Sequence, residues 1–248
     1  MRGFYEWLVK PKPLGRGVSE GYARDLLSYA RRPFDPGKRY SVVAYRLLLK
    51  YIELRYRVDV DGFLKRLKIP RTGVDLKVPS EDLILESLEY LRGIETRRRD
   101  YYQLYLLLLA SGVRLCEAQL FLAGFGGYQA LEQGGVRVYA VNYQRGSKAV
   151  FYVFTPSWLR LRRDRVNWET HGPHRGVPVK PKYVRKFVAT KMFELDIPAE
   201  VIDFIQGRTP RSILAQHYLN LLPKAVREYA KYAEWLHSFL ERANVPVD

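Results

Sequence analysis

The hydrophobic residues of this chain follow helical spacing almost throughout and change to strand spacing once. In Val136–Pro156, two runs rich in β-branched and aromatic residues flank the polar stretch QRGSK. Two such runs around a glycine-containing turn predict an antiparallel β-hairpin. Elsewhere the apolar residues recur three and four positions apart, which is the spacing of amphipathic helices. The sequence therefore predicts a mainly α fold with one small antiparallel β-hairpin or sheet.

A stretch without periodicity divides the chain. Ile69–Ser80 holds two prolines and a glycine, which favour a loop, so residues 71–79 are predicted to form a linker. Residues 1–70 are expected to form a helical domain, and residues 80–248 a larger second domain that ends in a long helix. Helices of the first domain are expected over Val18–Arg32, with Ser19 as N-cap, Ser41–Tyr56 and Val60–Ile69.

The charge of the chain favours a polyanionic partner. Lys and Arg number 42 against 26 Asp and Glu, a net charge of +16. Residues 1–79 hold 18 of these basic residues and 8 acidic ones, so most of the excess lies in the first third. Nucleic acid is the first partner that such a charge suggests and an anionic membrane surface the second. The longest apolar run, Leu104–Ala110, is far too short to span a bilayer.

Double-stranded DNA is therefore the expected partner of the basic first domain, and no membrane is expected. The candidate DNA contacts lie on its first two predicted helices and the turn between them: Arg24, Arg31, Lys38, Arg39 and Arg46. The alternative is a solvated basic domain without this role. One cysteine excludes an intrachain disulfide and a cysteine-cluster metal site. We expect an intracellular, cytoplasmic, DNA-associated protein without cofactor or metal.

Four segments of the second domain place cations among apolar residues. Arg114 follows a Ser-Gly break and lies three residues before Glu117, so the two can meet on one helical face. The other candidates are Lys148 at the hairpin turn, Lys182 and Arg185 three residues apart, and Arg208 ten residues before Tyr218. A single basic residue in so basic a chain is usually a surface charge, but an unpaired arginine among apolar helices is costly to bury, so Arg114 and Arg185 are candidates for a functional role.

These segments resemble the catalytic domain of the tyrosine recombinase, or phage integrase, family over roughly residues 80–222. ASGVRLCEAQL resembles its first arginine box, VNYQRGSKAV its β-hairpin lysine loop, and VRKFVAT its second arginine box. DIPAEVIDFIQGRTPRSILAQHYLNL resembles its closing segment with the nucleophile. Lys182 and Arg208 replace the histidines usual in the family, and Lys186 replaces a third. A Lys-x-x-Arg box with a later Arg is similar to the subgroup of archaeal viruses and plasmids.

The resemblance implies a two-domain architecture, a helical core-binding domain followed by an α+β catalytic domain. It implies a site-specific recombinase that cleaves and rejoins DNA through a 3′-phosphotyrosyl link to Tyr218, without metal or ATP. Arg114, Arg185, Lys182 and Arg208 would bind the phosphate, and Lys148 would be the general acid; Arg145 is the other hairpin candidate. Dimers or tetramers on DNA are expected. A type IB topoisomerase-like enzyme and an inactive DNA-binding protein of this fold stay open as alternatives.

Overall fold

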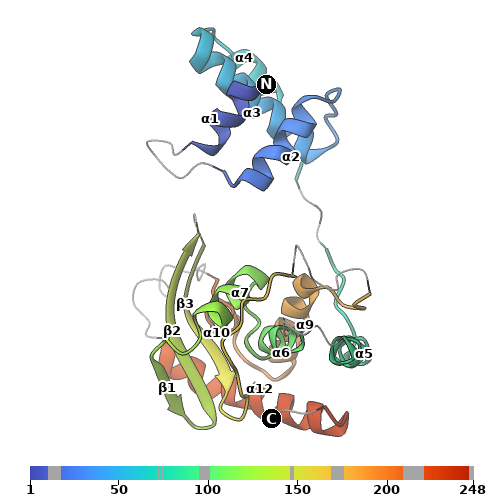
Figure 1. The fold of residues 1–248 in the computed structure, drawn as a ribbon, viewed down its shortest axis with the longest axis vertical. Helices are drawn as coiled ribbons and strands as arrows, with labels where there is room; N and C mark the ends of the chain where they lie inside the picture. The colour runs from blue at the N-terminus through green and yellow to red at the C-terminus, as the bar shows by residue number, and fades with distance from the viewer. Residues whose placement is uncertain are drawn as a thin grey trace. The chain divides into compact units, whose positions relative to one another are not determined.

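The chain forms two compact units, Met1–Leu76 (unit 1) and Lys77–Asp248 (unit 2) (Figure 1). The computed structural model describes residues 1–10, 18–71, 73, 75–94, 101–145, 148–168, 176–208 and 221–245, without the side chains of residues 144–149. The boundary between the units falls within the predicted linker, residues 71–79, and the described residues there form no helix or strand.

Unit 1 is helical, as predicted. Its helices are α1 (Arg2–Val9), α2 (Glu20–Ala30), α3 (Arg39–Tyr56) and α4 (Asp61–Arg66). Ser19 caps α2, because its hydroxyl accepts a hydrogen bond from the backbone N–H of Tyr22. The core consists of apolar side chains from α1, α2 and α3: Phe4, Leu8, Ala23, Leu26 and Ala44. Helix α1 was not predicted from the sequence, although Phe4 and Leu8 have helical spacing and are both fully buried.

Unit 2 surrounds the apolar helix α6 with other helices and a sheet. Its helices are α5 (Glu81–Gly93), α6 (Tyr101–Ser111), α7 (Leu115–Gly124), α9 (Pro181–Glu194), α10 (Ala199–Ile205) and α12 (Leu221–Arg242). Nearly every residue of α6 is buried, because α5, α7, α9 and the sheet contact it on different sides. Among the described residues no single helix is long and apolar enough to cross a membrane. Only α6 and α7 taken together reach that length and hydropathy, and the chain bends by 115° between them.

The predicted hairpin is confirmed, and it belongs to a three-stranded antiparallel sheet. The strands β1 (Ala130–Gln133), β2 (Val136–Arg145) and β3 (Lys148–Pro156) lie in the order β1-β2-β3. Strand β1 was not predicted from the sequence; the two-residue turn Gly134–Gly135 joins it to β2. Both glycines have positive φ, 58° and 74°, as tight hairpin turns require, so the Gly-Gly pair was the signal for this strand.

The C-terminal helix α12 packs on its own unit. The hydroxyl of Tyr229 donates to the carbonyl of Ala110 (2.9 Å), and that of Tyr232 to the carbonyl of Leu109 (2.7 Å). Figure 1 shows α12, in red, running along the base of unit 2 past the sheet and the helices. The apolar stripe of this helix in the sequence allows packing on its own domain or on a neighbouring protomer. These two buried bonds to α6 show that it packs on its own domain.

Candidate active site

The turn that follows α10 collects two arginines from distant parts of the chain. Nη1 of Arg185 donates to the carbonyl of Gln206 (2.7 Å), and Nη1 of Arg114 donates to the carbonyl of Gly207 (3.0 Å). Gly207 has a φ of +65°, a conformation that glycine adopts at little cost. Two successive carbonyls of one turn therefore hold the arginines of α7 and α9 together.

Arg114 is the N-cap of α7, and Glu117 fixes its direction. One oxygen of Glu117 accepts from the backbone N–H of Arg114 (2.8 Å), and the other accepts from its Nη1 (2.6 Å). The side chains are 25% and 9% exposed, so this ion pair is partly shielded from water. The sequence left open whether Glu117 forms a helix salt bridge or orients Arg114; the geometry lets one carboxylate do both.

Arg185 is the most deeply placed cation of this group. Its Nη1 also donates to the carbonyl of Gly112 (2.9 Å), at the end of α6. Its Nη2 is buried and has no hydrogen-bond partner among the described residues. Burial, together with the nearby charges of Arg114 and Arg208, lowers the pKa of Arg185 to about 9. The guanidinium is thus still charged at neutral pH and retains a donor for an anion.

Arg208 extends the cationic group at the end of the turn. Its backbone N–H donates to the carbonyl of Asp203 (2.7 Å), and its Nη1 contacts the Asp203 carboxylate (3.0 Å). The side chain is 42% exposed, which makes it the most accessible of the three arginines. The structure therefore brings Arg114, Arg185 and Arg208 together, as the resemblance to the integrase family implies.

Strand β3 lies directly against the same turn. A Cβ atom on Gly207 would come within 2.5 Å of Cγ2 of Val150. Lys148 begins this strand two residues earlier and pairs with Arg145 across the hairpin. The side chains of Lys148 and Arg145 lie outside the described structure, so the choice between them as the hairpin residue of the site stays a prediction.

Lys182 lies on α9 beside an aromatic ring. Its Nζ is 4.3 Å from the ring centroid of Tyr183, and Nζ of Lys77 and of Lys186 lie 5.3 and 5.5 Å from the same ring. These contacts are cation–π interactions. They place Lys182 on a lysine-rich surface one helical turn before Arg185.

The predicted nucleophile, Tyr218, lies outside the described residues. The undescribed segment 209–220 begins directly after Arg208 and ends where α12 starts, at Leu221. The described residues on either side of the segment are Arg208, in the turn that holds the arginines, and Leu221, at the start of a helix that hydrogen-bonds to α6.

The basic residues predicted to bind DNA differ in their surroundings in unit 1. Arg24, Arg31, Lys38 and Arg39 are exposed. Arg24 forms an ion pair with Glu20, Lys38 one with Asp35, and Arg39 donates to the carbonyl of Pro70. Arg46 is partly buried, and its Nη1 donates to the carbonyls of Leu64 (2.5 Å) and Leu67 (2.8 Å). Arg46 thus caps the C-terminal end of α4.

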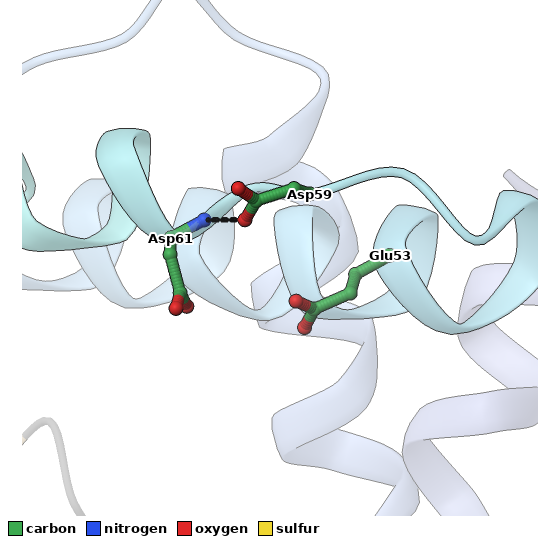
Figure 2. Close-up of side chains that lie close together, drawn as sticks. All are labelled: Glu53, Asp59 and Asp61. Carbon is green, nitrogen blue, oxygen red and sulfur yellow. Dashed lines mark hydrogen bonds between the residues drawn. The ribbon is translucent and has the colours of Figure 1, made fainter.

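Unit 1 also contains a group of carboxylates that could hold a cation. Glu53 on α3, Asp59 and Asp61 have carboxylate oxygens within 4.8 Å of one another (Figure 2). The backbone N–H of Asp61 donates to Asp59 (2.9 Å), so part of the grouping follows from a local turn. Asp59 and Asp61 are exposed and Glu53 is half-buried. Oxygen ligands of this kind suit hard divalent cations, and the group lies in a different unit from the arginines.

Sequence reasoning missed one residue of the arginine site, Gln206. This glutamine is fully buried, and both its backbone and its side chain contact Arg185. The available signal was a polar residue at the C-cap of α10, directly before Gly207.

The comparisons with known proteins agree with this arrangement. No curated protein matches the chain. The family model described as archaeal phage integrase matches residues 76–235, which is well over half of the chain and includes every residue of the arginine site and Tyr218. The chain belongs to the archaeal phage integrase family.

Proposed function

We propose that this protein is a site-specific DNA recombinase that cuts and rejoins DNA through a covalent bond to Tyr218. One observation carries the proposal: Arg114, Arg185 and Arg208 meet at a single turn, and the segment that holds Tyr218 begins directly after it. Integrases act on DNA, so the family membership supports the substrate.

The arginines suit the chemistry of a phosphodiester. Its non-bridging oxygens share a negative charge that repels nucleophiles and grows in the transition state, and guanidinium groups stabilise that charge. Nη2 of Arg185 is a buried donor without a partner among the described residues. A phosphate oxygen would supply that partner.

The proposed reaction has two steps. The Tyr218 oxygen attacks phosphorus, a 3′-phosphotyrosyl bond forms, and the bond to the 5′-oxygen breaks. Nearby cations favour the tyrosinate form, so Tyr218 loses its proton to water before it attacks, and Lys148 gives the leaving oxygen a proton as general acid. In the second step a 5′-hydroxyl attacks the phosphorus of the phosphotyrosyl link and returns its proton to Lys148. The bond to Tyr218 breaks, which rejoins the strand and releases Tyr218 as tyrosinate. The phosphotyrosyl bond conserves the energy of the broken one, so no ATP is needed.

The remaining basic residues fit DNA binding. Lys182 lies on α9 with Arg185, where it would join the arginines at the scissile phosphate, and Lys186 on the same helix would contact a phosphate next to it. The exposed basic residues of unit 1 would bind the duplex as a core-binding domain. Self-association on DNA is part of this proposal, since strand exchange needs more than one active site on the two duplexes.

The experiment is covalent trapping. The protein is incubated with a pool of nicked duplexes with random-sequence cores, and protein–DNA adducts are separated by denaturing electrophoresis and sequenced. Wild type is expected to form adducts. Arg185→Lys should lower their formation at least 100-fold, because one lysine cannot donate to two carbonyls and a phosphate in the same geometry.

Arg137→Lys is the matched control. Arg137 is also a partly buried arginine of unit 2, and it contacts Glu132 and a backbone carbonyl, but it lies on the sheet away from the turn that holds Arg114 and Arg185. No adduct with any sequence in the pool would refute the proposed reaction. Exchange between two labelled duplexes carrying a recovered site would distinguish a recombinase from a topoisomerase-like enzyme.

A further inference from the structure

We infer that Gln206 is a positioning residue that aligns Arg185 for the scissile phosphate. The inference rests on the proposed function, because it concerns the same site. Its basis is a set of contacts in which one fully buried glutamine joins α9, the end of α6 and the turn at Gly207.

Gln206 and Arg185 contact each other in both directions. The backbone carbonyl of Gln206 accepts from Nη1 of Arg185 (2.7 Å), and Nε2 of the Gln206 side chain donates to the backbone carbonyl of Arg185 (2.9 Å). The first bond fixes the end of the arginine side chain, and the second fixes its backbone. Together the two bonds tie residue 206 to both the guanidinium and the backbone of Arg185, so the carbonyl that holds Nη1 is fixed relative to α9.

The glutamine side chain also lies against Gly112, whose carbonyl is the other acceptor for Nη1 of Arg185. A Cβ atom on Gly112 would come within 2.7 Å of Nε2 of Gln206 and 3.1 Å of its Cγ. Gly112 has a φ of +62°, a conformation that glycine tolerates best. Gln206 therefore supplies one acceptor for Arg185 with its own carbonyl and contacts Gly112, which supplies the other.

These contacts determine which arginine atom stays available. Both acceptors bind Nη1, and Nη2 is buried without a partner among the described residues. Oε1 of Gln206 is likewise buried without such a partner. An unpaired buried acceptor is costly, so packing alone would favour an apolar side chain here. Positioning of Arg185 explains why a glutamine occupies the site.

The test compares two buried glutamines of unit 2. Gln206→Met preserves side-chain length and apolar packing but removes the bond to Arg185. Gln103→Met is the control: Gln103 on α6 is also buried and pairs with the backbone of Arg162 in both directions (3.2 and 2.7 Å). Each variant loses a similar backbone contact, so a merely structural role predicts similar effects for both.

Single-turnover cleavage on duplexes recovered from the random pool is the first measurement. Gln206→Met is expected to form adduct 10- to 100-fold more slowly than wild type, with the Kd for the same duplex changed less than threefold. Gln103→Met should cleave within threefold of wild type. Equal rates for the two variants, or a loss of Gln206→Met activity that follows a loss of DNA binding, would overturn the inference.

A DNA-independent measurement separates this inference from the proposed function. Inorganic sulfate is the probe, and the increase in Tm with sulfate at constant ionic strength reports anion binding by Arg185. Gln206→Met is expected to reduce this increase at least twofold and Gln103→Met to leave it unchanged. If wild type forms no DNA adduct, the proposed reaction fails while the sulfate result still tests Gln206; an undiminished sulfate effect in Gln206→Met contradicts the positioning role.

Discussion

Gly207→Ala is the substitution that most directly perturbs the arginine site without removing a charge. Gly207 has a φ of +65°, where a side chain is strained, and an added Cβ would lie 2.5 Å from Cγ2 and 3.0 Å from Cγ1 of Val150. Val150 is buried in β3, so it has little room to move. The turn or the strand must shift, and the carbonyls that hold Arg114 and Arg185 shift with the turn.

The magnitude follows from two contributions. Alanine with positive φ costs about 1–2 kcal/mol, partly offset by about 0.4–1 kcal/mol from the less flexible unfolded chain. Forcing a methyl group into a filled core costs about 1–3 kcal/mol more. Gly207→Ala should therefore lower the free energy of unfolding by roughly 2–4 kcal/mol. Adduct formation should fall at least 10-fold, because misplacing catalytic groups by about 1 Å has effects of this size or larger.

Gly135→Ala isolates the conformational contribution. Gly135 has a φ of +74°, but nothing lies within 4 Å of the position that an added Cβ would take, so this variant should lose only about 1 kcal/mol. Val150→Ala in the Gly207→Ala background should remove the clash, so that the two substitutions are less than additive by about 1–3 kcal/mol. Urea unfolding followed by tryptophan fluorescence measures this, since three of the four tryptophans, Trp158, Trp168 and Trp235, lie in unit 2. Equal destabilisation by Gly207→Ala and Gly135→Ala would refute the packing of β3 on the turn.

Four further predictions concern charge. At pH 7, sulfate at ten times its Kd should stabilise unit 2 by about 1.4 kcal/mol, or roughly 3–6 °C in Tm, and Arg185→Gln should abolish the effect. The pKa of Arg185 is lowered from 12.5 to about 9, so the unfolded chain binds more protons above pH 9. Deprotonation of Arg185 in the folded protein should therefore make the unfolding free energy rise with pH above pH 9 and should weaken sulfate binding. Thermal melts at pH 8–10.5 would show both effects. Melts of Arg185→Gln with the same pH dependence as wild type would contradict the prediction. Arg24→Ala should lower the salt slope of DNA binding by about one. Arg46→Ala should instead destabilise unit 1 by about 1–3 kcal/mol, as urea unfolding would show; a stable Arg46→Ala variant with weakened DNA binding would assign Arg46 to the DNA surface.

Local features of the fold were predictable from the sequence because their signals are local. Ser19 and Ser80 cap α2 and α5 as their positions before apolar periodic segments indicate. The single change of hydrophobic period predicts the β2–β3 hairpin. The first strand was missed because ALEQ has no strand pattern of its own, and its pairing depends on the Gly134–Gly135 turn.

The composition of the arginine site was predictable, but its internal contacts were not. The resemblance of the basic segments to those of the integrase family implies that Arg114 and Arg185 share a site, and the structure brings them together. That backbone carbonyls of Gln206 and Gly207 hold them could not be predicted, because carbonyls carry no sequence signal. Arg46 illustrates the same limit. A basic residue in a basic domain suggests a DNA contact, but its side chain donates to the carbonyls at the end of α4, which are distant in the sequence.

Mapping the DNA adduct is the most direct test of the central claim. The wild-type adduct is digested with trypsin and nuclease, and mass spectrometry locates the nucleotide. The account predicts a nucleotide on the peptide Ser212–Lys224, whose one tyrosine is Tyr218, and no adduct from Tyr218→Phe, which should still bind DNA with wild-type affinity. An adduct on another residue, or one that persists in Tyr218→Phe, would contradict it.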